Sequence, residues 1–259
     1  MTEQERLLEK QEQTLKRMQK FSVRTTAKKV RTTNTLLRLL LIILILLLLL
    51  MSISWACARF VNSTGFTVNL DSDSKGLSLF DNGEGENPTT RLTAEPLEDM
   101  WNISVDWLPD NLDDTYASHN GDADNDGKAD YIAYTFELGN DTKSDIKYNS
   151  TINVDAQEKN ADNAIRVRLI RNGVKKDYAK ASANGKAEIV AADATWIDPT
   201  IVMKENAAMI KSGERVKYTV VIWFEGDDPE CVNDILGGEV KLSMTFDVVD
   251  DEAGNGELV

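Results

Sequence analysis

The sequence contains little of several residue types on which small scaffolds and enzyme sites often depend. Two cysteines among 259 residues exclude a disulfide-rich scaffold, so an apolar core must hold the fold together. There is one histidine, His119, and the sequence has no zinc-spaced His/Cys set and no phosphate-binding glycine loop. A histidine-based triad also needs a nucleophile, which cannot be identified near His119 in the sequence. Support for an enzyme is therefore weak.

Charge is distributed unequally along the chain, whose formal net charge is -14 at neutral pH. The first 57 residues contain ten Lys or Arg against four Asp or Glu, which gives +6. The remaining residues contain 19 basic and 39 acidic groups, which gives -20. An acidic domain of this kind is repelled by nucleic acid and attracts cations. We therefore exclude nucleic acid as a partner.

A long apolar run separates the basic part from the acidic part. Every residue from 39 to 51 is Leu, Ile or Met, and no charge occurs between Arg38 and Arg59. As a helix, residues 39–58 would span roughly 30 Å, the thickness of a bilayer's hydrocarbon core. The sequence thus predicts a transmembrane helix or a long signal segment over residues 39–58. Because basic residues precede it, we expect a cytoplasmic N-terminus and an extracytoplasmic C-terminal domain.

Two fates of this segment remain open. Residues 56–58, Ala-Cys-Ala, fit the small-x-small pattern that signal peptidases cut, and cleavage after Ala58 would release the domain to the cell surface or matrix. The preceding basic cytoplasmic tail, residues 1–38, is longer than a usual signal n-region, which favours a retained single-pass anchor. Within this tail, residues 3–21 have a helical pattern and residues 22–35 are typical of a juxtamembrane linker.

Beyond the apolar run the pattern becomes that of strands and turns. Short stretches of alternating apolar and polar residues are separated by Asp, Asn and Gly clusters, and Asn172-Gly173 favours a hairpin turn. We predict an all-β domain over residues 59–250, an antiparallel jelly-roll or immunoglobulin-like sandwich. Helix is expected only in short pieces such as residues 207–211, a loop at 81–98, and an acidic tail at 251–259. The predicted strands are 66–71, 77–80, 101–107, 131–138, 146–154, 164–171, 175–179, 215–224 and 239–249.

The most specific chemical signal is the Asp-rich segment 122–130. Its alternate carboxylates can turn inward onto one hard cation, and Gly127 permits the sharp bend. We predict a structural Ca²⁺, because carboxylate oxygens on a flexible loop suit this large ion. The segment is not a complete EF-hand, since Ala133 occupies the twelfth position; the alternative is an acidic surface turn without a tightly held ion. The predicted ligands are Asp122, Asp124, Asp126, Asp130 and the carbonyl of Lys128.

Cys231 follows the acidic stretch Asp227-Asp228-Pro229-Glu230, whose negative charge is expected to raise the pKa of its thiol. It is expected to be an unpaired thiol rather than a partner of Cys57 or of another chain.

Several segments together resemble the TasA/camelysin group of secreted proteins of Gram-positive bacteria. The sequence 54–60, Ser-Trp-Ala-Cys-Ala-Arg-Phe, resembles the processing region of that family. Residues 65–68 and 76–79 resemble its first strands, and residues 233–239 leading into 242–246 are similar to its final strand. The resemblance implies a jelly-roll-like sandwich exported to the cell surface, in a family that builds biofilm-matrix fibres by strand exchange or is described as surface proteases. No His-Glu-x-x-His motif is present, so protease activity is not carried over.

Three functional hypotheses follow. The leading one is a non-enzymatic cell-surface or biofilm-matrix protein, whose calcium-binding sandwich contacts other copies by strand exchange or binds other surface molecules. The first alternative is a membrane-anchored sensor or accessory ectodomain, held through residues 39–58. The second is an extracytoplasmic hydrolase that uses carboxylates. A mature N-terminus near Arg59 favours the first hypothesis, and an intact Met1 favours the anchored protein.

Overall fold

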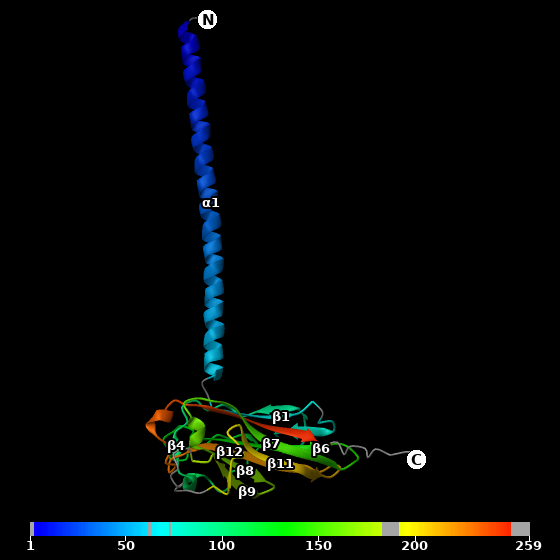
Figure 1. The fold of residues 1–259 in the computed structure, drawn as a ribbon. Helices are drawn as coiled ribbons and strands as arrows, with labels where there is room; N and C mark the ends of the chain where they lie inside the picture. The colour runs from blue at the N-terminus through cyan, green and yellow to red at the C-terminus, as the bar shows by residue number, and fades with distance from the viewer. Residues whose placement is uncertain (1–2, 62–63, 73, 183–191, 250–259) are drawn as a thin grey trace, which may run out of the picture. The chain divides into compact units, whose positions relative to one another are not determined.

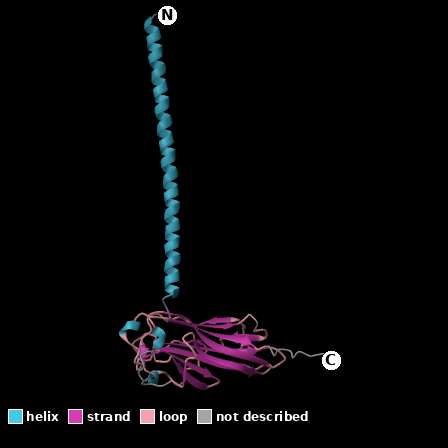
Figure 2. Cartoon of the chain, in the orientation of Figure 1, coloured by secondary structure: helices cyan, strands magenta, loops and turns pink. Residues whose placement is uncertain are grey.

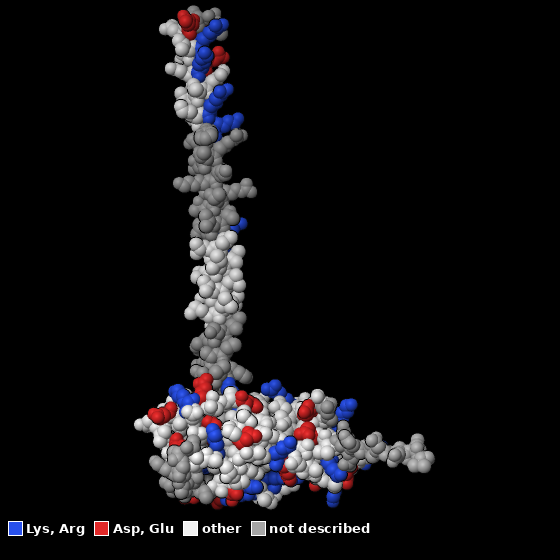
Figure 3. All heavy atoms as spheres, in the orientation of Figure 1, with Lys and Arg blue, Asp and Glu red and all other residues white. Residues whose placement is uncertain are grey.

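The computed structural model describes residues 3–61, 64–72, 74–182 and 192–249; within residues 21–37 and 52–61 it describes the helical backbone alone. The chain divides into two compact units, residues 1–61 and 62–259. The first unit is one helix, α1 (Glu3–Val61). Charged side chains occupy its described N-terminal turns, and the apolar residues 39–51 follow as an uncharged stretch (Figure 3). Each of these 13 apolar side chains is 48–69% exposed.

The predicted transmembrane helix over residues 39–58 is wrong. Within the part of the chain that the structure describes, no helix combines the length and the apolar character needed to cross a membrane. The apolar run with described side chains, residues 39–51, rises only about 20 Å as an α-helix, whereas a bilayer core is about 30 Å thick. The prediction had also counted residues 52–58, whose side chains lie outside the described part. The interpretations of residues 39–58 as a single-pass helix and as a signal anchor are therefore wrong as well.

The second unit consists of two β-sheets (Figures 1 and 2). The first is five-stranded with the order β11-β7-β13-β1-β3. β1 and β13 run parallel, and every other neighbouring pair in this sheet is antiparallel. Its longest outer edge belongs to β11, which pairs with β7 on one side and with no other described strand. The strands are β1 (Gly65–Leu70), β3 (Arg91–Thr93), β7 (Ile146–Gln157), β11 (Ile201–Ile210) and β13 (Val240–Val248).

The second sheet is eight-stranded, with the order β10-β9-β8-β12-β6-β2, β4 beside β12 and β5 beside β6. β12 lies at its centre and pairs antiparallel with both β6 and β8. The strands are β2 (Leu77–Phe80), β4 (Asn102–Ile103), β5 (Ala117–Ser118), β6 (Tyr131–Asn140), β8 (Ile165–Arg171), β9 (Val174–Ala179), β10 (Ala194–Thr195) and β12 (Arg215–Glu225). Among the described residues, η1 (Val105–Trp107) lies between β4 and β5, and two further 3₁₀ turns lie in connections between the two sheets: η2 (Ala161–Asn163) and η3 (Asn233–Ile235).

The two sheets pack against each other through aromatic side chains. The ring of Phe246, from β13, lies 6.1 Å from Phe136 of β6 and 5.3 Å from Tyr218 of β12. The hydroxyl groups of Tyr148 and Tyr218, from opposite sheets, lie 2.7 Å apart in a hydrogen bond. All four residues are almost completely buried. This two-layer arrangement is compatible with the predicted sandwich.

A second, smaller core covers the outer face of the eight-stranded sheet. Residues 103–123, which we call the cover segment, place Ile103, Leu108 and Leu112 against Val221 and Trp223 of β12. Strand residues alternate between faces, so β12 contributes Val220 and Ile222 to the main core and its other face to this smaller one. The cover segment leads directly into the Asp-rich loop.

Strand prediction failed where the backbone is irregular. The short helix expected at residues 207–211 is wrong, because residues 207–210 belong to β11. That strand carries a register shift between Glu205 and Ala208, and Ala207 has φ 56°, so the alternation that marks a strand is interrupted. β3 lies within the predicted loop 81–98, and the predicted strand 101–107 divides into β4 and η1.

We expect Phe136→Ala to lower the free energy of unfolding by about 3–5 kcal/mol, because it removes a ring that touches both sheets. Val174→Ala, at a side chain that is 73% exposed, should change it by less than about 0.5 kcal/mol. Urea unfolding followed by circular dichroism measures both. Equal effects of the two substitutions would contradict the assignment of Phe136 to the interface between the sheets.

Candidate functional site

The Asp-rich loop, residues 122–130, connects the cover segment to β6. Its carboxylates accept hydrogen bonds from the loop's own backbone. Asn125 N donates to Asp122 Oδ1 at 2.6 Å, and Gly127 N donates to Asp122 Oδ2 at 2.7 Å. Asp126 N donates to Asp124 Oδ1 at 2.9 Å. Asn125 and Gly127 have φ 64° and 90°, the left-handed conformation that Asn and Gly tolerate best and that the tight bend requires.

Three of the four predicted carboxylate ligands come together. One carboxylate oxygen from each of Asp122, Asp124 and Asp130 lies within 4.8 Å of the others. Calcium binds oxygens at about 2.3–2.6 Å, so two ligands of one ion lie at most about 5 Å apart. The three carboxylates are therefore close enough together to contact one metal ion. Asp126 is outside the group, and its Oδ1 accepts from Lys128 N at 2.8 Å.

The acidic residues of the loop differ in their electrostatic environment. Asp130 is 1% exposed, and burial raises its pKa, as do the neighbouring charges of Asp124 and Asp122, against the effect of the Ala123 N–H at 2.8 Å. Desolvation also acts to raise the pKa of exposed Asp122, but the N–H donors of the loop outweigh it and leave that pKa lowered. A cation bound at this point would offset the repulsion between the Asp130 carboxylate and its acidic neighbours.

The two ends of the loop are joined by main-chain contacts. Asp130 N donates to Gly121 O at 2.7 Å, and Gly121 forms a β-bridge with Tyr131. A Cβ at Gly121 would lie 2.0 Å from the Tyr131 hydroxyl oxygen, so any larger residue there would have to displace the Tyr131 ring. Nearby, the ring nitrogens of His119 lie 2.7 Å from Leu112 O and 3.0 Å from Ala117 O. His119 thus ties together two parts of the cover segment.

A cavity of about 300 Å³ lies beside this loop. The side chain that connects the two features is Lys128, which lines the cavity and has its Nζ 5.4 Å from the centroid of the Trp101 ring. The wall is built from the residues before β4, the end of β12 and the segment around η3. No pattern in the sequence indicates this cavity, because its walls come from segments more than 100 residues apart. Its main polar lining residues are Asp99, Asn102, Asn233 and Glu239.

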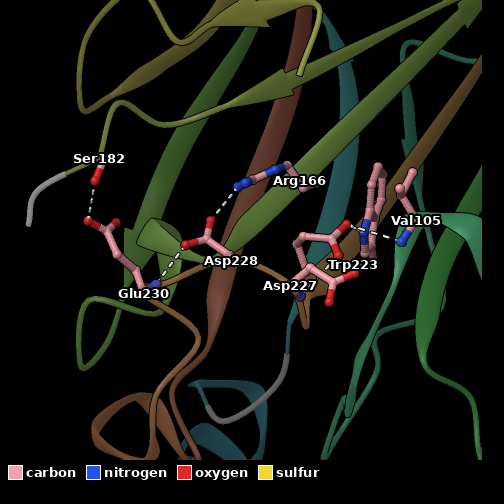
Figure 4. A network of polar contacts seen from close by, with 8 residues as sticks. Val105, Arg166, Ser182, Trp223, Asp227, Asp228 and Glu230 are labelled. Atoms are coloured by element: carbon pink, nitrogen blue, oxygen red, sulfur yellow. Dashed lines mark hydrogen bonds and ion pairs between the residues drawn. The ribbon is translucent and has the colours of Figure 1, made fainter. Parts of the chain in front are cut away.

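A buried ion pair joins β8 to the chain just after β12 (Figure 4). Arg166 Nη1 of β8 and Asp228 Oδ2 are 2.8 Å apart, with side chains that are 2% and 0% exposed. The Asp228 carboxylate also accepts from Glu230 N at 2.7 Å, and Ser182 Oγ donates to Glu230 Oε1 at 3.2 Å. These contacts fix the chain after β12 in place.

Glu225, at the end of β12, is completely buried next to this pair. Trp223 Nε1 and Val105 N each donate to its Oε2 at 3.1 Å. Burial raises the pKa of Glu225, and these two hydrogen bonds act in the opposite direction. Glu225 therefore joins the cover segment to β12.

Cys231 lines the cavity and is a free, half-buried cysteine. The prediction that its thiol pKa is raised is confirmed, but burial is the largest cause, followed by the charges of Asp228 and Glu225. The side chain of Cys57 lies outside the described residues.

We expect Asp228→Ala to lower the free energy of unfolding by about 3–5 kcal/mol, because it leaves the Arg166 charge buried opposite an apolar side chain. The matched control is Glu205→Ala, which removes the partly exposed pair of Glu205 and Arg171, with side chains 37% and 30% exposed. That change should cost no more than about 1 kcal/mol. Chemical unfolding of both variants measures the difference, and a small effect of Asp228→Ala would show that the buried pair contributes little.

Comparison with known proteins gives no assignment: no model of a known protein family matches the chain, and no curated protein matches it significantly. The resemblance to the TasA/camelysin group stays a prediction, and the function must be argued from the geometry of the domain.

Proposed function

We propose that the acidic domain is a non-enzymatic cell-surface or matrix protein whose β-sandwich is stabilised by one structural Ca²⁺ in the loop 122–130. The observation that carries this proposal is the convergence of Asp122, Asp124 and Asp130 oxygens within 4.8 Å. The donor set consists of carboxylates, which suit Ca²⁺ better than the softer transition metals.

The position of the loop suggests what the ion would do. Ala123, at the start of the loop, packs against the smaller core beneath the cover segment. Asp130, at its end, immediately precedes Tyr131, the first residue of β6 and a member of the same core. A cation shared by Asp122, Asp124 and Asp130 would therefore hold the cover segment onto the eight-stranded sheet. Its role is stabilisation, and no catalytic step is assigned to it.

The expected affinity supports a location outside the cytoplasm. Three convergent carboxylates on an exposed loop favour a weak site, of the class with dissociation constants of about 10⁻⁴–10⁻³ M that extracellular modules use. Such a site fills only where calcium is abundant. The net charge of -20 beyond residue 57 also keeps separate copies apart until cations screen it.

The contacts of buried Glu225 and of His119 support a non-enzymatic role. Glu225 is completely buried and accepts hydrogen bonds from Trp223 and Val105. His119 lies against two backbone carbonyl groups of the cover segment. Both side chains are therefore engaged in holding the fold together.

We expect about 10 mM Ca²⁺ to raise the melting temperature of the full chain by about 3–5 °C, because binding to the folded state alone stabilises it. Mg²⁺ at the same concentration should have a smaller effect, because it loses its water ligands reluctantly. Differential scanning calorimetry measures both shifts.

Two variants locate the ion. Asp124→Ala should abolish the Ca²⁺-dependent shift, because Asp124 belongs to the converging group. Asp126→Asn is the matched control, since Asp126 lies outside that group, and it should retain most of the shift. No calcium response in the unaltered chain, or equal losses in the two variants, would rule the site out.

Asp130→Asn should separate calcium binding from intrinsic stability. The pKa of Asp130 is raised in the folded state, so its contribution to stability is greatest below its unfolded pKa and is lost as pH rises through the folded pKa. At neutral pH without calcium, Asp130→Asn should therefore equal or exceed the parent in stability, while its Ca²⁺ response disappears. Melting temperatures at pH 4 and pH 7, with Ca²⁺ and with chelator, test both parts; a less stable calcium-free variant at pH 7 would contradict the first part.

A further inference from the structure

The cavity beside the loop has several apolar side chains in its lining. Trp101, Val232 and Leu236 line it and are 54%, 49% and 65% exposed. Met100 and Ile235 add further apolar side chains to the wall. A volume of about 300 Å³ lies at the lower limit of small-molecule sites and is large enough for one long side chain.

One acidic group in this wall has an unused acceptor. Glu239 Oε2 is shielded from solvent, and no hydrogen-bond donor reaches it among the described residues. Burial raises the pKa of Glu239, the charges of Glu158, Asp99 and Glu98 raise it further, and Lys241 lowers it. A buried carboxylate oxygen without a donor costs free energy, which a positively charged donor would recover.

Another lining residue, Trp101, already interacts with a cation. Lys128 Nζ lies 5.4 Å from the centroid of the Trp101 ring, within the range of a cation–π contact. Trp101 and Glu239 both line the cavity. One provides an aromatic face and the other an unpaired negative oxygen, an arrangement that complements an ammonium group on an aliphatic stem.

From these contacts we propose that the cavity binds a lysine side chain presented by a partner polypeptide, with its ammonium group donating to Glu239 and its methylene groups packed against Trp101. A polypeptide is favoured over a free amine because Val232 and Leu236, which line the cavity, are 49% and 65% exposed and offer apolar surface to the residues beside the lysine. Buried anchors surrounded by such apolar contacts are typical of protein interfaces. This inference does not depend on calcium binding.

The first experiment compares two short peptides that differ in charge alone. Acetyl-Leu-Lys-Leu-amide should bind at least about tenfold more tightly than the same peptide with norleucine in place of lysine. Titration of the ¹⁵N-labelled full chain should shift the indole N–H signal of Trp101, which Trp101→Phe assigns. Equal affinity of the two peptides would overturn the proposal. n-Butylammonium binding as tightly as the lysine peptide would overturn the assignment to a polypeptide.

Three variants test the residues. Glu239→Gln should lower the affinity for the lysine peptide about tenfold. Lys128→Met should raise this affinity about threefold, because it removes a positive charge that repels the peptide's lysine. Asp234→Asn is the matched control, since Asp234 is exposed, carries the same charge nearby and does not line the cavity; it should leave affinity unchanged. Unaltered melting temperatures establish that the variants fold, and equal effects of Glu239→Gln and Asp234→Asn would contradict a specific contact.

Two further measurements separate this inference from other interpretations. The same Trp101 signal can be followed during titration with cellobiose. A larger shift with cellobiose than with the lysine peptide would identify a saccharide site and overturn the proposal. Peptide binding should persist in chelator, because Glu239 and Trp101 lie outside the Asp-rich loop. If the unaltered chain responds to calcium but does not bind the lysine peptide, this inference alone is overturned. If it binds the peptide but does not respond to calcium, the calcium site alone is overturned.

Discussion

The domain depends on the contact of two apolar sheet faces through a small group of aromatic rings. Phe246 touches Phe136 and Tyr218 across the interface, and Tyr148 adds the hydrogen bond that satisfies both buried hydroxyl groups. This packing fixes β12 at the centre of the eight-stranded sheet. Because β12 is apolar on both faces, it also carries the smaller core on its outer side. The cover segment, the Asp-rich loop and one cavity wall therefore all depend on the position of this strand.

Buried charged residues fix the position of the segment that follows β12. Arg166 and Asp228 form an ion pair with almost no exposure, and Glu225 is held by backbone and indole donors close by. Taking charges out of water is costly, and such a pair stabilises a fold only when its geometry is well satisfied. The Arg166–Asp228 pair therefore favours a single conformation of the chain after β12. That arrangement places Cys231 in the cavity wall, beside Phe224 of β12.

The two proposed sites share one physical principle. Asp130 in the loop and Glu239 in the cavity are both carboxyl groups with raised pKa values, and burial is the main cause for each. Other acidic residues stand near both, so each would be more stable with a cation close by. The loop presents three converging carboxylates and suits a compact metal ion. The cavity is lined by one shielded carboxylate oxygen and by an aromatic ring, and it suits an organic cation.

The sequence by itself determined what is local. Alternation in residues 240–248 predicted a strand because one face of it is buried, and the spacing of Asp122 and Asp124 predicted a loop that folds back on itself. It misjudged β11, where the left-handed Ala207 interrupts the alternation, and it counted residues 39–58 as a membrane span. The tertiary structure alone decided that Asp126 stays outside the group of carboxylates, that Arg166 meets a carboxylate 62 residues away, and that a cavity exists. The reason is physical: a sequence pattern records which side of a segment avoids water, whereas the partner on that side is chosen by packing between segments that are distant in the chain.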